Sequence, residues 1–503
     1  MDVLGGLFHG FAVALQPANV FWCFIGCLLG TIVGILPGLG PAATIAMLLP
    51  LTYKMDPAGG IIMMAGIYYG AKYGGSTTSI LLNIPGESSS VVTCIDGYQM
   101  ARKGRAGAAL GIAAIASFVA GTFGVIALSL IAPPVSAFAL SFSSPEYFAL
   151  MCLGLALVVL LSGPSLIKGL LSMLLGLWLT SIGTDIFTAQ ARFIFGQSTL
   201  LGGIDVMVIA IGVFAISEVL ASIEAGEDAQ VLPVPKGLRN LLPNVAELKA
   251  CRFAFLNGSV TGFLLGCLPG AGATIASFIS YGIEKAVSKH PENFGQGAPE
   301  GVAAPEGANN ADTGGALVPL LTLGIPGGSS TAIMLSALVI WGVRPGPLMM
   351  TESPDVFWGL VCSMYIGNVM LLILNLPLVP VFAQILRLPA FILFPVILGI
   401  SLVGAYGGAG RLFDLGLVVG FGLLGYAMGK LKFPTAPLIL GFVLGDNMER
   451  ALRQSLMMSQ GDVKFLVERP ISAVMLAAAA LILISPLLTW LNRARVQALA
   501  ENG

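Results

Sequence analysis

Long apolar runs, separated by shorter polar stretches, recur along the whole chain of 503 residues. An α-helix needs about 20 residues to cross about 30 Å of hydrocarbon, and many of the runs approach that length. Because backbone polar groups must be paired inside a bilayer, the pattern predicts an all-α polytopic integral membrane protein. The predicted membrane segments are residues 20–36, 58–71, 106–132, 146–162, 165–182, 204–221, 256–268, 271–284, 355–385, 388–405, 412–429, 433–445 and 471–491.

A polar stretch divides these runs into two sets. Residues 224–252 carry charges of both signs and three prolines, which is typical of an aqueous connector. We therefore predict a first membrane repeat at 1–223, a connector at 224–252 and a second membrane repeat at 253–503. A further polar stretch, residues 285–310, predicts an aqueous loop or a surface helix.

A first block of identical residues occurs in both sets, with glycines four positions apart leading into Pro-Gly-x-Gly. Its seven members recur at one offset, 258 − 26 = 232. They are Gly26, Gly30, Gly34, Leu36, Pro37, Gly38 and Gly40 in the first half, and Gly258, Gly262, Gly266, Leu268, Pro269, Gly270 and Gly272 in the second. Internal duplication is the simplest account, as in many transporters.

The glycines and the Pro-Gly pairs of this block predict different things. Glycines at four-residue spacing let helices approach closely in lipid, so we expect them to serve packing. Proline removes a backbone donor and glycine loosens the chain, so the helix should break at each Pro-Gly. The helix start after each break suits an anion. The freed backbone groups at Gly38, Gly40, Gly270 and Gly272 are candidates for holding a coupling cation.

A second block combines a glycine pair, a short apolar run and a Pro-Gly turn rich in hydroxyls. Gly74 and Gly75 match Gly314 and Gly315 at an offset of 240, and the Pro-Gly turns match at 241. Eight to ten residues are too few to span a bilayer, so each unit predicts a re-entrant hairpin or a discontinuous helix. The substrate-binding candidates are Gly75, Ser76, Thr77, Asn83, Pro85, Gly86, Ser88, Ser89, Pro326, Gly327, Ser329 and Ser330. The alternative is that the hydroxyls only satisfy backbone groups at the breaks.

Charged residues beside these blocks are functional candidates, because charge is costly at membrane depth. Lys72 aligns with Asp312 at the offset of 240. Lys72 is a candidate for holding an anionic substrate, while Asp312, Glu87 and Asn310 are candidates for the coupling cation or proton. A mutual ion pair or an interfacial position explains Lys72 and Asp312 equally well.

Composition excludes several other functions. The 24 basic residues balance the 25 acidic ones, so no basic surface exists to hold nucleic acid. The two histidines, His9 and His290, lie outside the apolar runs, which argues against an intramembrane Ser-His pair or an H-E-x-x-H zinc site. The chain lacks a nucleotide-binding P-loop sequence. We expect no cofactor, no resident metal and no enzymatic activity, with Na⁺ or H⁺ as the coupling ion.

Four ordered motifs, at residues 34–41, 69–77, 83–87 and 305–311, resemble the large membrane subunit of tripartite tricarboxylate transporters. Gly307 is a departure, since Ala is expected there. The resemblance implies a multi-pass protein of the bacterial inner membrane that works with a small membrane subunit and a periplasmic solute-binding protein. It also implies secondary active import, by symport with sodium or protons, of citrate or other di- and tricarboxylates.

Together these observations predict two repeats of inverted topology with alternating access to a central site. The basic cluster at residues 102–105 follows block two in the first half, and only Arg344 follows it in the second, which favours inversion. Two alternatives stay open: a passive organic-anion channel, and an intramembrane enzyme that uses Glu87 or Asp312.

Overall fold

The computed structural model describes residues 3–36, 40–161, 165–185, 187–225, 237–385, 390–409 and 411–484. These residues are almost entirely helical, as predicted, with one short β-hairpin among them. The elements of the first half are α1 (Val3–Ala14), α2 (Pro17–Ile35), α3 (Pro41–Leu48), η1 (Leu49–Thr52), α4 (Pro57–Leu82), η2 (Ser88–Ser90), α5 (Val91–Met100), η3 (Ala101–Arg105), α6 (Ala106–Ala139), α7 (Ser144–Leu161), α8 (Leu166–Thr180), β1 (Gly183–Thr184), β2 (Ala191–Arg192), η4 (Ser198–Gly202), α9 (Val206–Ala210), η5 (Ile211–Ile216) and α10 (Ser217–Ala225).

The second half repeats this helical character. Its elements are α11 (Leu238–Leu241), α12 (Val245–Ala250), α13 (Arg252–Gly266), α14 (Gly272–Val287), η6 (Pro291–Asn293), α15 (Pro299–Leu323), α16 (Ser329–Ile340), α17 (Met349–Glu352), α18 (Pro354–Asn375), α19 (Val379–Ile385), α20 (Ala390–Ala409), α21 (Leu412–Lys430), α22 (Ala436–Met458) and α23 (Phe465–Glu468). In the predicted connector, the described residues 237–250 include the short helices α11 and α12.

Six helices in the described part of the chain are long and apolar enough to cross a membrane. They are Pro17–Ile35, Ser88–Ala139, Ser144–Leu161, Val206–Glu224, Pro354–Asn375 and Leu412–Lys430. The polytopic all-α prediction is therefore confirmed.

The chain forms two compact units, and neither follows the boundary between the halves. Unit 1 takes residues 1–139 and 205–427, and unit 2 takes residues 140–204 and 428–503. Each unit therefore draws on both halves of the sequence.

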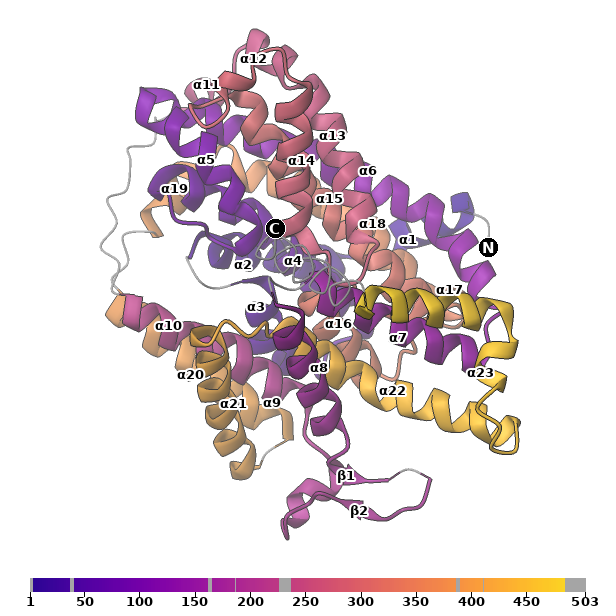
Figure 1. Ribbon diagram of the computed structural model, residues 1–503. Helices are drawn as coiled ribbons and strands as arrows, with labels where there is room; N and C mark the ends of the chain where they lie inside the picture. The colour runs from indigo at the N-terminus through magenta and orange to yellow at the C-terminus, as the bar shows by residue number, and fades with distance from the viewer. Residues whose placement is uncertain are drawn as a thin grey trace, which may run out of the picture. The chain divides into compact units, whose positions relative to one another are not determined.

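Two long helices, α4 and α15, form the centre of unit 1 (Figure 1). Both are buried along almost their whole length, from Ala58 to Leu81 and from Gly301 to Thr322. Helix α2 packs on α4, and its repeat counterpart α13 packs on α15. The core of unit 1 is thus built from the same helix pair used twice.

The glycine stripe of block one explains this pairing. A Cβ atom added at Gly30 or Gly34 would lie 2.6 Å from the Ile67 carbonyl oxygen or 2.2 Å from that of Ala71. In the second half, a Cβ atom at Gly262 would lie 2.2 Å from the carbonyl oxygen of Ala308. Side chains cannot fit at such distances, so the predicted packing role of these glycines is confirmed in both halves.

The same contacts correct the alignment of the two central helices. Gly34 faces Ala71, and its counterpart Gly266 faces Asp312, so the offset between α4 and α15 is 312 − 71 = 241. The left-handed residues that end the two helices, Asn83 and Gly324, give the same value, 324 − 83 = 241. The equivalence of Lys72 with Asp312 was therefore wrong by one position. One residue turns a helix by about 100°, so the two side chains occupy different faces of their helices.

Two predictions about helix limits were also wrong. Gly74 and Gly75 do not interrupt α4, which continues to Leu82. The close approach of α2 explains this, because a Cβ atom at Gly74 would lie 2.3 Å from the carbonyl oxygen of Thr31. Likewise, the polar residues 299–310 lie in the buried helix α15 and not in an aqueous segment. The break in each half comes only at the Pro-Gly turn.

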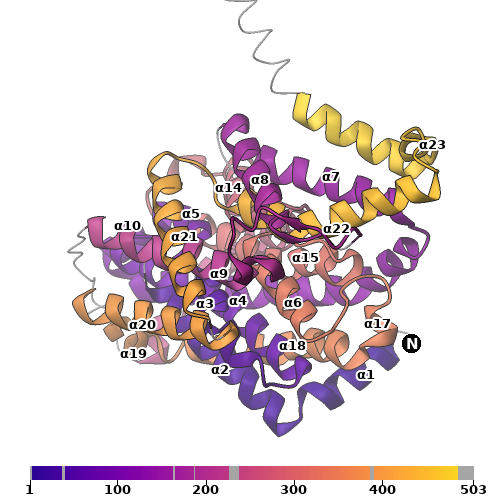
Figure 2. The same cartoon turned by 90° about the horizontal axis from the view of Figure 1, so that it is seen from below.

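Unit 2 is built on α7, α8 and α22, which pack against one another (Figure 2). Gly176 of α8 permits this contact, since an added Cβ atom would lie 2.1 Å from the carbonyl oxygen of Leu438. Beyond α8, the Asp185 carboxylate accepts backbone hydrogen bonds from Thr188 and Phe187 and binds Arg453 at 2.9 Å. These partners hold the pKa of Asp185 well below its ordinary value.

Candidate functional site

The hydroxyl-rich turns of block two follow the ends of α4 and α15. Helix α4 ends before Asn83 and the chain turns into η2, while α15 ends before Gly324 and the chain turns into α16. The third hydroxyl of each turn caps the next helix, because Ser90 Oγ and Thr331 Oγ1 accept the backbone N–H of Glu87 (3.3 Å) and Gly328 (2.9 Å). Ser90 and Thr331 therefore satisfy backbone groups at the breaks, as the alternative interpretation expected.

The Pro-Gly break of block one meets the break of block two. In the second half, α13 ends at Gly266 and α14 begins at Gly272, so the predicted interruption is present. Gly270 has a φ of 85°, which favours glycine, and its N–H donates to the Gly327 carbonyl at 2.9 Å. Pro37 and Gly38 of the first half lie outside the described residues.

Gly86 holds the corresponding place in the first half. A Cβ atom there would lie 2.1 Å from the Gly34 carbonyl oxygen and 2.7 Å from the Cα atom of Gly75. The turn after α4 is therefore pressed against the C-terminal end of α2. Gly86 and Gly75 from the predicted site have a packing role that needs no ligand.

Each block-two turn also contacts the other half of the chain. The turn at η2 lies against α14 and α15, and α16 lies against α3 and α4. At the first of these contacts, the hydroxyls of Thr274 and Ser88 are 3.1 Å apart. Discontinuous elements from both repeats thus meet inside unit 1.

Lys72 forms a buried ion pair at the first turn. Its Nζ lies 2.9 Å from Glu87 Oε2 and 3.5 Å from Ser89 Oγ, and the Ser89 hydroxyl also donates to the other Glu87 oxygen. Lys72 and Glu87 are 6% and 7% exposed, so each needs the other as counter-charge. In this conformation, the Lys72 ammonium is paired with the Glu87 carboxylate.

Asp312 lies near this pair and is incompletely satisfied. Tyr68 donates to its Oδ2 over a long 3.4 Å, while Oδ1 is buried without a hydrogen-bond partner. The side chain is 2% exposed. A buried carboxylate oxygen with no donor is unfavourable, so Asp312 is a strong candidate for taking up a proton or a cation.

Glu306 is a further buried acid, and it was absent from the predicted site. It is fully buried in α15, and it accepts hydrogen bonds from Ser76 (2.5 Å), Thr93 and Asn309 (3.4 Å). The sequence contained a signal, a glutamate between Pro305 and Gly307 in a family motif, but the polar surroundings of that motif predicted an aqueous segment.

Asn310, a predicted cation candidate, is part of the same cluster. Its amide nitrogen donates to Ser117 Oγ (2.8 Å), Asn309 Oδ1 (2.6 Å) and the Glu306 carbonyl (3.0 Å). These bonds commit the donor side of Asn310 to joining α15 to α6.

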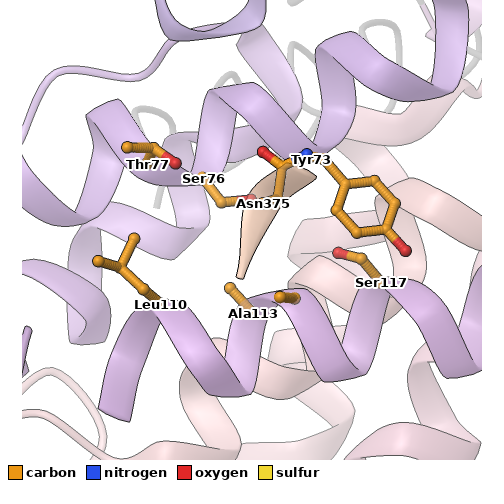
Figure 3. A pocket seen from close by; sticks show the side chains of 8 residues that line it. Tyr73, Ser76, Thr77, Leu110, Ala113, Ser117 and Asn375 are labelled. Atoms are coloured by element: carbon orange, nitrogen blue, oxygen red, sulfur yellow. The ribbon is translucent and has the colours of Figure 1, made fainter. Parts of the chain in front are cut away.

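A small cavity adjoins this cluster. Tyr73, Ser76 and Thr77 of α4 line one side of it (Figure 3), and Leu110, Ala113, Ala114 and Ser117 of α6 line the other, together with Asn375. The space within it that a water-sized sphere can reach is about 10 Å³. That is about the room one water molecule needs, so in this conformation the cavity suits water and not a tricarboxylate.

Residues 20–440 match the model of a family described as "Tripartite tricarboxylate transporter TctA family". The chain belongs to this family. It is therefore a membrane transporter component. This speaks against the alternative of an intramembrane enzyme that uses Glu87 or Asp312.

Two proteins of Agrobacterium vitis are similar to this TctA-family chain. An uncharacterised 52.8 kDa protein in the TAR-I ttuC' 3' region is 46% identical over 501 residues, which cover 100% of this chain and 99% of that protein. An uncharacterised protein in the TAR-II ttuC' 3' region is 43% identical over 241 residues, which cover 48% of this chain and all of that protein. No solved structure matches.

Within this TctA-family protein, the predicted site residues fall into separate places. Lys72, Glu87 and Ser89 are in contact, and Ser76 lies with Glu306 instead. No group of three His, Cys, Asp or Glu side chains in the described residues is arranged to hold a metal ion. Among the described residues, the acids near the turns therefore lie at separate positions.

Proposed function

We propose that this TctA-family protein is the large permease subunit of a secondary transporter that imports citrate or other di- and tricarboxylates. A periplasmic solute-binding protein delivers the substrate, and a small membrane subunit completes the transporter in the bacterial inner membrane. Uptake is coupled to Na⁺ or H⁺ and proceeds by alternating access between two inverted repeats.

One observation carries this proposal: within unit 1, interrupted helices from both halves are in contact beside a buried ion pair. The Ser88–Thr274 contact joins the halves, and the Lys72–Glu87 pair lies in the same turn. Irregular backbone at membrane depth is tolerated only where protein or a water-lined cavity satisfies it, and transporter sites are built there.

The ion pair supports a simple exchange mechanism. A substrate carboxylate takes the place of Glu87 on the Lys72 ammonium, since both are carboxylates of similar geometry. Glu87 then loses its counter-charge at depth, and its unpaired negative charge favours the uptake of a proton or a cation nearby. Binding of anion and cation is coupled in this way without a metal cluster, and both leave when the turns separate.

The test uses the complete transporter in proteoliposomes, with binding protein and labelled citrate. We expect saturable uptake that needs the binding protein and a Na⁺ or H⁺ gradient. A Ser88→Cys/Thr274→Cys variant should lose uptake when oxidised and recover it on reduction, because the disulfide locks the contact between halves. Each single cysteine variant is the control. Flux that is independent of binding protein and gradient, or unaffected by the disulfide, contradicts the proposal.

A further inference from the structure

Glu306 combines complete burial with the lack of a counter-charge. Among the described residues, no Lys, Arg or His forms an ion pair with it, and its three hydrogen-bond donors, Ser76, Thr93 and Asn309, are all neutral. An ionised carboxylate buried without a cation loses its hydration with little compensation. The protonated acid is therefore the form that this site favours at rest.

The surrounding hydroxyls satisfy Glu306 in both protonation states. When the carboxylate is ionised, Ser76 and Thr93 each donate to one of its oxygens. When Glu306 is protonated, its O–H donates to Ser76 Oγ, and the Ser76 hydroxyl turns to the Lys72 carbonyl oxygen, which lies 3.4 Å away. Thr93 continues to donate to the other oxygen. Only one hydroxyl must rotate, because a serine hydroxyl both donates and accepts.

The titratable groups that act on Glu306 come from three neighbouring segments. Glu87, before η2, adds negative charge, while Tyr73 of α4 and Cys94 of α5 feel the charge of Glu306. Lys72, the nearest basic residue on α4, is bound to Glu87. Helices α6 and α14 present neutral hydroxyls near this part of α15, Ser117 and Ser277. Burial has the largest effect on the charge of Glu306, and the negative charge of Glu87 adds to it in the same direction.

A small cavity beside α4 and α6 lies next to this acid. Ser76 lines the cavity (Figure 3), and its hydroxyl also donates a hydrogen bond to Glu306. Ser117, on the opposite wall, is joined to the cluster through Asn310. A water molecule in this cavity needs polar partners, and these hydroxyls supply them.

We propose that Glu306 carries the proton that is transported with the substrate. This inference rests on the proposed function and names the coupling ion and its carrier. A hydronium ion in the cavity gives its proton to the Glu306 carboxylate and becomes water. After the turns have moved, Glu306 gives the proton to water on the other side. While substrate holds Lys72, a free Glu87 repels an ionised Glu306, so the loaded state keeps the proton bound.

The test compares Glu306→Gln with the wild type in proteoliposomes that contain the complete transporter, binding protein and a trapped pH indicator. Glutamine keeps the shape and the hydrogen bonds of the protonated acid. We expect loss of citrate accumulation driven by a proton gradient and loss of substrate-linked proton entry. Exchange of internal for external citrate should stay within about twofold of wild type, because exchange needs no net release of the proton. A purely structural role would reduce exchange as well.

Glu284→Gln is the matched control, since Glu284 of α14 is another buried glutamate that accepts from a neutral amide, Asn257 Nδ2 at 3.1 Å. It should accumulate citrate and take up protons like wild type. Wild-type uptake that follows a sodium gradient without proton entry overturns the inference while leaving the proposed function intact. Proton entry that persists in Glu306→Gln also overturns it. Wild type that shows no citrate uptake refutes the proposed function itself.

Discussion

The two halves of unit 1 share a pair of closely packed helices but carry their charges at different positions. At the offset of 241, Lys72 corresponds to Thr313 and Glu87 to Gly328, while Glu306 corresponds to Ala65 and Asp312 to Ala71. The glycine stripe, the left-handed helix ends and the turns are shared. Each of these four charged residues therefore aligns with an uncharged residue in the other half.

The shared features are backbone packing and the turns that end α4 and α15, while the differences lie in where charge is placed. The compensated pair, Lys72 with Glu87, belongs to the first half, and the uncompensated acids, Glu306 and Asp312, belong to the second. We infer that the first half handles the anion and the second half handles the coupling ion.

The largest expected effect tests the close packing of the helix pairs α2–α4 and α13–α15, which both halves share. Gly34→Ala and Gly262→Ala each place a Cβ atom 2.2 Å from a backbone oxygen, so the helix pair must separate. We expect each variant to lose about 4 kcal/mol or more of unfolding free energy, measured by denaturation in detergent. Gly40→Ala is the control, since nothing lies within 4 Å of its added Cβ. If only one of the two variants kept its stability, the two helix pairs would not be equivalent.

The next effect tests the compensated pair. Lys72→Met leaves Glu87 buried without its counter-charge and should lower the unfolding free energy by about 3–5 kcal/mol. The double variant Lys72→Met/Glu87→Gln should recover most of this loss, because no unpaired charge remains. A double variant as unstable as the single one would mean that packing, not charge, explains Lys72. The measurement is again denaturation in detergent.

A smaller effect of opposite sign is expected in the second half. Asp312→Asn removes a carboxylate whose Oδ1 is unpartnered, and we expect a gain of about 1 kcal/mol in stability with reduced substrate uptake. Glu87→Gln in the first half should instead lose stability. If both variants changed stability in the same direction, the contrast between compensated and uncompensated acids would fail.

The smallest effect concerns the contact between the halves. Ser88→Ala removes a partly exposed hydrogen bond to Thr274 and should lower the unfolding free energy by about 0.5–1.5 kcal/mol. Thr274→Ala should do the same, and the double variant should cost no more than either one. Additive losses in this double-mutant cycle would show that the two hydroxyls do not interact.

Sequence patterns predicted the parts of this structure that depend on glycine and proline. The stripe at Gly26, Gly30 and Gly34 was assigned to packing, and the break before Gly272 was expected, since both depend on backbone geometry alone. The continuity of α4 through Gly74 was not predictable in this way. It depends on a neighbouring helix that encloses the glycine.

Polar residues were harder to interpret, because their environment is set by partners distant in sequence. Glu306 accepts hydrogen bonds from Ser76, 230 residues earlier, and from Thr93, and these distant partners make its burial tolerable. The one-residue error at Lys72 has a similar origin. Neighbouring glycines allow a match at both offsets, and only the contact with α2 chooses between them.

The hydrogen bond between Gly270 and Gly327 has a consequence for how such transporters diversify. It joins two interruptions through main-chain atoms alone, so only a proline at position 270 would remove one of its groups. The side chains of the next turn, at Ser329 and Ser330, can therefore change without breaking this main-chain link. If these hydroxyls contact the substrate as predicted, a change of cargo would leave the connection between the two interruptions intact.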